Sequence, residues 1–204
     1  VRAMHRIRHG VFRTECRRSH WLSNETGCEL WLKSEHQQFT GSFKERTPAA
    51  TQTHTTASLS LLPMRRPRII LSHTPACAGG ARNALLSLDS DDASRGVVAA
   101  SAGNHALALA FHGADLGVPV TVVMPATAPM AKVDKCRLFG ANVVIAGAHI
   151  GEAKDYAMAH FDHQRYVNGY DDPEIIAGTG TLGIEMLEQV DTCDVCVVRA
   201  SRQR

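Results

Sequence analysis

The chain has 204 residues, of which 44% are hydrophobic and 21% are charged, and its formal net charge is +2. This length and hydrophobic content suit one globular domain or two small lobes with modest cores. So small a net charge does not favour a nucleic-acid partner, and no apolar run approaches the roughly 20 residues of a membrane-spanning helix. We therefore expect a cytoplasmic protein that has neither nucleic acid nor a membrane as its partner.

The first segment, residues 1–11, has helical spacing with apolar side chains on one side, namely Ala3, Met4, Ile7 and Val11. Arginines are frequent near this end and acidic residues are scarce. This favours a solvated helix face over the alternative of a transit-like segment. The sequence begins with Val, so a fragment or a processed product is one interpretation.

Residues 28–32 read as a short strand, and residues 40–46 read as a turn followed by the start of a helix. Gly41 and Ser42 form the turn and the helix cap, and Lys44 lies in the first helical turn. A lysine that is partly desolvated near the positive end of a helix loses its proton easily, which suits Schiff-base chemistry. For Lys44 considered alone, a solvated surface amine is the alternative.

After Arg46 the periodicity disappears. Residues 47–79 are rich in Thr, Ser, Pro and Arg, with prolines at positions 48, 63, 67 and 75, and we predict a disordered insertion. Residues 58–62 and 69–71 are its only apolar patches. Our hypothesis is that the insertion comes from unspliced or mis-assigned coding sequence. A transcript that joins Arg46 to Gly80 would support this hypothesis, and amplification of the long form alone from cells would contradict it.

The stretch around which the chain is organised is residues 96–111. Its apolar run at 97–100 predicts a buried strand, a small turn follows, and helical spacing then continues from Ala106. Where a strand ends and a helix begins, unpaired backbone N–H groups and the helix dipole favour an anionic ligand group. The alternative for Ser101 and Asn104 in this turn is ordinary helix capping.

The rest of the chain alternates between strands and helices. A helix at 81–88 precedes the central unit, and further strands are predicted at 118–124, 143–145, 165–167 and 194–198, with helices at 129–139, 151–161 and 181–189. Alternation with short links predicts an α/β fold, a doubly wound parallel sheet in three αβα layers.

Two weaker motifs have plainer interpretations. Gly178-x-Gly180-x-x-Gly183 fits a dinucleotide-binding fingerprint, but a helical turn precedes it instead of a strand, and an arginine-rich region follows. Cys193 and Cys196 have the spacing of a redox or metal half-site, but no second pair accompanies them. We interpret the six cysteines as small hydrophobic residues, mostly buried, and expect no metal site.

Ser42-Phe43-Lys44 followed by Ser101-Ala102-Gly103-Asn104-His105 resembles the fold-type II pyridoxal-phosphate enzymes, and most of all their serine/threonine dehydratase and serine racemase group. The resemblance extends over residues 1–198 apart from the interruption at 47–79. It implies a large cofactor-binding lobe made of residues 1–46, 80–94 and 171–204, which is only partial. It also implies a small αβα lobe of residues 95–170, which is complete.

The resemblance implies pyridoxal 5'-phosphate as the cofactor and assigns roles by position. Lys44 forms the Schiff base with the cofactor, Phe43 flanks its ring, and Asn104 bonds its hydroxyl group. The loop Ser101, Ala102, Gly103 and Asn104 takes the substrate carboxylate. His105 lies next to this loop and is counted with the substrate-binding residues, and the alternative that we favour for it is structural hydrogen bonding.

The chain departs from the family pattern in three places. Glu15 follows Thr14 where the family has proline, and Thr179 stands where glutamine is usual. The family's last strand leads into a glycine run that holds the cofactor phosphate, whereas here Val198 is followed by Arg199 and five further residues. Losing several charge-assisted hydrogen bonds, at roughly 1.5–3 kcal/mol each, predicts weakened cofactor binding.

By this resemblance the chain is expected to be an ammonia-lyase that converts L-serine or L-threonine to a 2-oxo acid and ammonia. Racemases of the group carry a second serine where this chain has Ala102, which favours the dehydratase over the racemase alternative. A catalytically silent fragment is the other alternative. The expected partners are a small amino-acid substrate and, for the intact family, a second copy in a homodimer.

Overall fold

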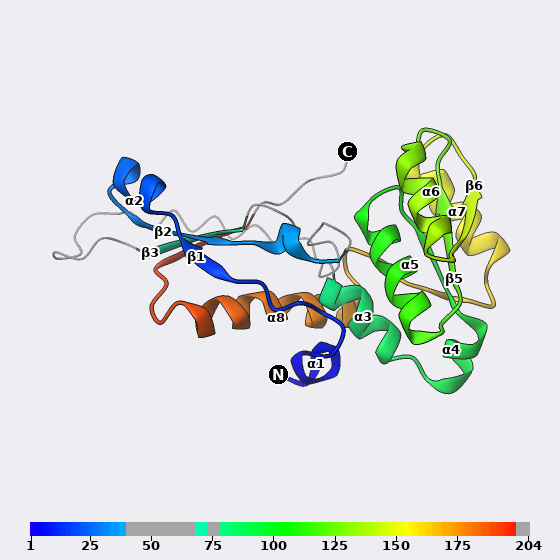
Figure 1. The fold of residues 1–204 in the computed structure, drawn as a ribbon. Helices are drawn as coiled ribbons and strands as arrows, with labels where there is room; N and C mark the ends of the chain where they lie inside the picture. The colour runs from blue at the N-terminus through cyan, green and yellow to red at the C-terminus, as the bar shows by residue number, and fades with distance from the viewer. Residues whose placement is uncertain (40–67, 73–77, 199–204) are drawn as a thin grey trace.

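The chain forms two sheets joined by helices (Figure 1). The structure is a computed structural model that describes residues 1–39, 68–72 and 78–198. One sheet has the strand order β1-β2-β3-β8 and the other has the order β6-β5-β4-β7. Within these ranges no helix is both long and apolar enough to cross a membrane.

The first sheet contains strands from both ends of the chain. Its strands are β1 (Cys16–Arg18), β2 (Glu29–Lys33), β3 (Arg68–Ser72) and β8 (Val195–Val198), and only the β1–β2 pair is antiparallel. The short helices α1 (Arg2–Ile7) and α2 (His20–Thr26) and the 3-10 turn η1 (Glu35–Gln37) accompany them. The α8 helix (Pro173–Gln189) packs along one face of this sheet (Figure 1).

Strand β3 corrects one prediction. Residues 68–72 were expected to belong to a disordered insertion, but they pair with β2 on one side and β8 on the other. Ile70 is fully buried in the cluster that α8 covers. Three consecutive apolar residues at 69–71 are enough for a short interior strand when both neighbours are parallel. The stretches 47–67 and 73–77 of the predicted insertion lie outside the described residues.

The second sheet is parallel throughout and confirms the predicted α/β, three-layer class. Its strands are β4 (Val97–Ala100), β5 (Val120–Met124), β6 (Asn142–Ile145) and β7 (Arg165–Tyr166). Helices α5 (Asn104–Leu116) and α6 (Met130–Leu138) pack on one face, and α7 (Ile150–His160) packs on the other. Both faces are lined by small and β-branched apolar residues, as a sheet covered on two sides requires.

Helix α3 (Ala78–Leu86) lies at the junction of the two sheets, and α4 (Ser90–Arg95) leads from it into β4 (Figure 1). Helix α3 packs against α8 and against α5. The Arg82 guanidinium of α3 donates to the Asp115 carboxylate at 2.5 Å and lies 3.3 Å from Nδ1 of His112, both on α5. Burial, reinforced by the Arg82 charge, lowers the pKa of His112 to about 3.

A buried ionic group ties β2 to α8. Lys33 has no exposed side-chain surface, and its Nζ donates to Oε2 of Glu185 at 2.9 Å and to the Thr14 carbonyl at 2.6 Å. Glu35, also buried, accepts a hydrogen bond from the Thr14 hydroxyl. Lys33 and Glu35, which directly follow the predicted strand at 28–32, therefore supply buried polar groups to the core of this lobe.

The three glycines of the fingerprint-like motif all lie inside α8. A Cβ at Gly178 would lie 2.1 Å from the carbonyl oxygen of Gly79 in α3, so this glycine permits close contact between the two helices. Gly178 is thus a helix-packing residue, and the motif lies within one helix, whereas a dinucleotide fingerprint directly follows a strand. The expectation of mostly buried cysteines is confirmed for Cys136 alone among the described cysteines. Cys16, Cys28 and Cys193 are intermediate, and Cys196 is exposed because β8 lies at the edge of the described sheet.

Candidate functional site

The loop Ser101–Ala102–Gly103 lies at the carboxyl end of β4, directly before α5. The Ser101 N–H donates to the Val123 carbonyl of β5 at 3.1 Å, which continues the ladder by one residue. The Gly103 N–H then points back to the Ser101 hydroxyl at 3.3 Å. The loop is therefore fixed to the ends of two neighbouring strands, where ligands bind in open α/β sheets.

The first turn of α5 faces the same edge. Gly103 is the N-cap residue in extended conformation and makes no side-chain cap, and the first turn contains no acidic residue. The first N–H groups of a helix have no partner within the helix and lie at its positive end, which favours an anion. The local geometry thus agrees with the anion-binding role expected for this turn.

Asn104 opens α5 and contacts a lysine from the next βα unit. The ammonium of Lys132, in the first turn of α6, donates to Oδ1 of Asn104 at 2.5 Å. Lys132 also lies close enough to the buried thiol of Cys136 to oppose the effect of burial, which raises the pKa of that thiol to about 11. Sequence analysis did not identify Lys132 as a site residue. Its position at the start of the helix after β5 would have indicated it only once β5 was known to be the neighbour of β4.

His105 makes a structural contact, as expected. It is buried, and its Nε2 lies 3.3 Å from the Val167 carbonyl just after β7. A Cβ at Gly169 would come within 2.8 Å of the imidazole ring, so the chain after β7 fits closely over it. His105 therefore holds residues 167–169 against the start of α5.

A small hollow lies beside this loop. It is lined by Ala100, Ser101, His105, Gly169 and Tyr170. Gly169 and Tyr170 were missed by sequence analysis, which read this region only as the end of a short strand. Because β7 pairs in parallel with β4, the residues that follow these strands meet at one edge.

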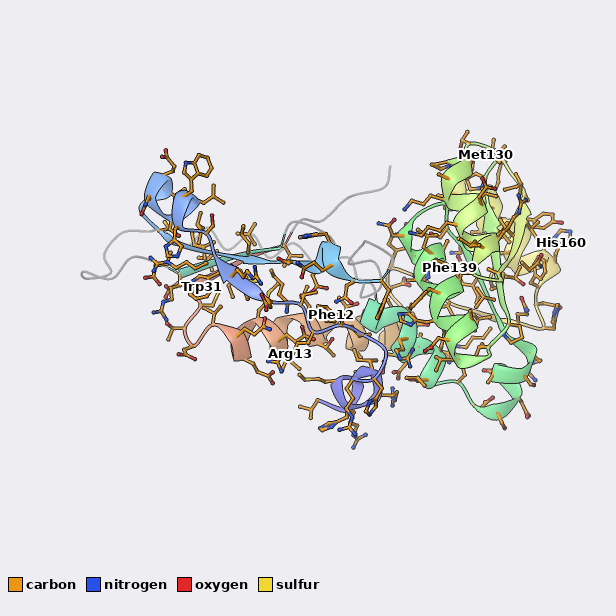
Figure 2. All side chains as sticks on the ribbon, viewed as in Figure 1. Phe12, Arg13, Trp31, Met130, Phe139 and His160 are labelled. Atoms are coloured by element: carbon orange, nitrogen blue, oxygen red, sulfur yellow. The ribbon has the colours of Figure 1, made fainter. Side chains whose placement is uncertain are left out.

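Ser101, Ala102, Gly103 and Asn104 thus lie together at the sheet edge, and His105 is buried directly after them. Phe43 and Lys44, the other predicted site residues, lie outside the described residues. Phe39, the last described residue before them, stacks on Phe111 of α5 with ring centroids 5.5 Å apart. Phe111 also meets Phe139, which is labelled in Figure 2, edge-on at 5.4 Å. This aromatic group brings the chain before Thr40 against the small lobe.

Known proteins resemble this chain in sequence and in fold. Residues 78–202 match the family model described as pyridoxal-phosphate dependent enzyme. An L-threonine ammonia-lyase of Thermotoga maritima is 35% identical over 96% of this chain and 41% of its own length. A beta-hydroxyaspartate dehydratase of Paracoccus denitrificans is 33% identical over 96% of this chain and 52% of its own length.

A solved structure of serine racemase from Dictyostelium discoideum is also similar. It has a TM-score of 0.73 and 28% identity, over 95% of this chain and 53% of that one. The chain therefore spans about half the length of the proteins it matches. The family model covers more than half of the chain and includes the whole segment 101–105. Membership of this family implies pyridoxal 5'-phosphate as the cofactor. The chain therefore belongs to the pyridoxal-phosphate-dependent enzymes of the serine/threonine dehydratase and racemase type.

Proposed function

We propose that this chain acts in an ammonia-lyase that converts L-serine or L-threonine to a 2-oxo acid and ammonia. The observation that carries the proposal is the Ser101–Asn104 turn, held at the carboxyl ends of β4 and β5 with the first amides of α5 beside it. A turn of this kind offers N–H groups and the Ser101 hydroxyl to the substrate carboxylate. The relatives named as threonine ammonia-lyase support the substrate class.

The described residues fit the cofactor at its aromatic hydroxyl. Asn104 presents a side-chain amide beside the loop, and the ammonium of Lys132 adds positive charge next to it. Both features favour an oxygen atom that carries negative charge. When bound, pyridoxal phosphate supplies an electron sink for the electrons that the departing α-proton leaves behind.

Lys44 is assigned two tasks under this proposal, to hold the cofactor covalently and to remove the α-proton with its Nζ. The length of the chain allows it to reach the site. Lys44 is five residue steps from Phe39, and these steps span at most about 18 Å. Along α5, Phe111, on which Phe39 stacks, is seven residues from Asn104, about 10 Å at 1.5 Å per residue.

Elimination is favoured over racemisation by Ala102. Racemisation needs a second acid to return the proton to the opposite face of the substrate, and alanine has no proton to give. In elimination the β-hydroxyl group leaves with the electrons of the broken C–O bond. The resulting enamine tautomerises and takes up water, which releases ammonia and the 2-oxo acid.

The test is the visible absorbance of the purified chain with added pyridoxal phosphate, followed by borohydride reduction and peptide mapping. We expect a coloured protein with the reduced adduct on Lys44, and no adduct in Lys44→Ala. A 2-oxo acid assay with L-serine, L-threonine and D-serine then measures the activity. A colourless chain, or one that releases no 2-oxo acid from either L-amino acid, would contradict the proposal and support a catalytically silent chain.

A further inference from the structure

The contact between Lys132 and Asn104 joins two separate βα units at the candidate site. Asn104 follows β4 and begins α5, whereas Lys132 follows β5 and lies in the first turn of α6. β4 and β5 are neighbouring parallel strands, so both side chains come from the same edge of the sheet. Their Nζ–Oδ1 distance of 2.5 Å is that of a short, charge-assisted hydrogen bond in a partly buried place.

This contact fixes which way the Asn104 amide faces. A carboxamide carries an acceptor oxygen at one end and a donor nitrogen at the other, and either end fits many sites. An ammonium group has three donors and no acceptor. Oδ1 must therefore face Lys132, and Nδ2, which can only donate, faces the other way.

Two other groups of α6, Cys136 and Asp134, could carry negative charge close to Lys132 in the sequence. Cys136, one helical turn further along α6, is fully buried, and its thiol stays protonated at neutral pH because burial raises its pKa to about 11. Asp134 on the same helix is exposed and lies 3.9 Å from Arg137 instead. Neither of these two α6 groups is an ion-pair partner of Lys132, so on this helix nothing competes with its contact to Asn104.

We propose that Lys132 is a positioning residue that turns Asn104 into a dedicated hydrogen-bond donor for an ionised aromatic hydroxyl group. The inference rests on the proposed function, because the hydroxyl is that of the pyridoxal ring. It extends that function by naming the residue that orients the cofactor contact. The ammonium acts through Asn104 and through its charge, and it takes no part in proton transfer.

The test compares Lys132→Met with Lys132→Arg and with the matched control Lys135→Met. Lys135 lies on the same helix, where its ammonium is 5.9 Å from the centre of the Phe139 ring. Pyridoxal phosphate is titrated into each variant while the absorbance is recorded. We expect K132M to bind the cofactor about tenfold more weakly. At fixed pH, part of its visible band should move to the near-ultraviolet band of the un-ionised hydroxyl.

The arginine variant keeps a charged donor and should restore the visible band, and K135M should match the wild type. A purely structural role for Lys132 would lower stability without moving the band. Wild-type affinity and an unchanged band in K132M would overturn the inference.

A second measurement separates this inference from the proposed function. The Asn104 side-chain amide resonances in cofactor-free protein should shift in K132M and stay in place in K135M. A wild-type protein that gives no band refutes the proposed function, and the orientation of Asn104 is then decided by these resonances alone. Resonances that do not respond to K132M show that Lys132 does not orient Asn104.

Discussion

The two sheets of this chain are stabilised in different ways. In the β4–β7 sheet, apolar residues fill both faces, with α5 and α6 on one side and α7 on the other. In the β1-β2-β3-β8 sheet the buried apolar cluster is small, formed by Ile70, Leu182, Met186 and Val190. Beside it lies a buried ionic group around Lys33.

The difference matters for the candidate site. Apolar burial tolerates small changes of shape, whereas a buried charge is costly as soon as its partner is lost. The Ser101–Asn104 loop, which we propose as the substrate-carboxylate site, follows a strand of the apolar sheet, so its geometry depends on the more tolerant lobe. The lobe that contains the β1-β2-β3-β8 sheet depends instead on a few specific polar contacts.

The largest effect is expected from Lys33→Met. This change removes the ammonium from Glu185 while leaving the carboxylate in the core, which should cost about 3–5 kcal/mol of unfolding free energy. Hydrogen exchange should rise in β1, β2 and α8 and stay unchanged in β4 and β5. As the reciprocal control, Leu107→Ala, at a fully buried position of α5, should cost about 2–5 kcal/mol and show the opposite pattern. Equal increases in both sheets for either variant would refute the comparison.

An intermediate effect is expected at the contact between α3 and α8. In Gly178→Ala the new methyl group meets the backbone carbonyl of Gly79, so the two helices must separate at a cost of about 1–3 kcal/mol. Gly180→Ala is the matched control on the same helix. No described atom lies within 4 Å of its new methyl group, and alanine should stabilise the helix by up to about 1 kcal/mol. Urea unfolding of both variants checks the opposite signs, and two losses of similar size would contradict the assigned contact.

Taken per pH unit, the smallest effect is expected from a change of pH at the junction. His112 has an ordinary pKa of 6.5 that burial and Arg82 lower to about 3, although Asp115 acts in the opposite direction. The unfolded chain therefore binds a proton near pH 6.5 that the folded chain does not. The stabilisation from His112 is complete above pH 6.5 and is lost as the pH falls toward 3, by up to about 1.4 kcal/mol per pH unit.

Urea midpoints measured between pH 7 and pH 4.5 test this slope. His112→Gln should flatten the fall in stability, whereas His20→Gln, which changes an exposed imidazole, should leave it as in the wild type. An unchanged slope in the His112 variant would show that His112 does not cause the fall in stability at low pH.

Much of the small lobe was predictable because its signals are local. The continuous apolar runs at β4 and β5 and the periodicity of α5 and α6 each indicate one element. The turn at Ser101 follows directly from the order strand, turn, helix. The contact between Lys132 and Asn104 was not predicted, because it depends on which strands are neighbours rather than on any one segment.

The large lobe was harder to predict, because its structure also depends on which segments become neighbours. Strand β1 has three residues, two of them arginines, and its pairing with β2 decides its structure. Strand β3 lies in a region whose composition suggests disorder, yet two parallel neighbours order it. Lys33 lies just after the predicted strand at 28–32, and its role in the core depends on a contact with Glu185, 152 residues further along the chain.

The position of β3 has a consequence for any shorter version of this chain. It separates β2 from β8, so these two strands lie two inter-strand spacings apart, about 10 Å. A product whose coding sequence joined Arg46 to Gly80 would lack this spacer, and β2 and β8 would have to close over the gap or pair elsewhere. The long and short isoforms would therefore carry differently assembled sheets, and they would differ in architecture as well as in length.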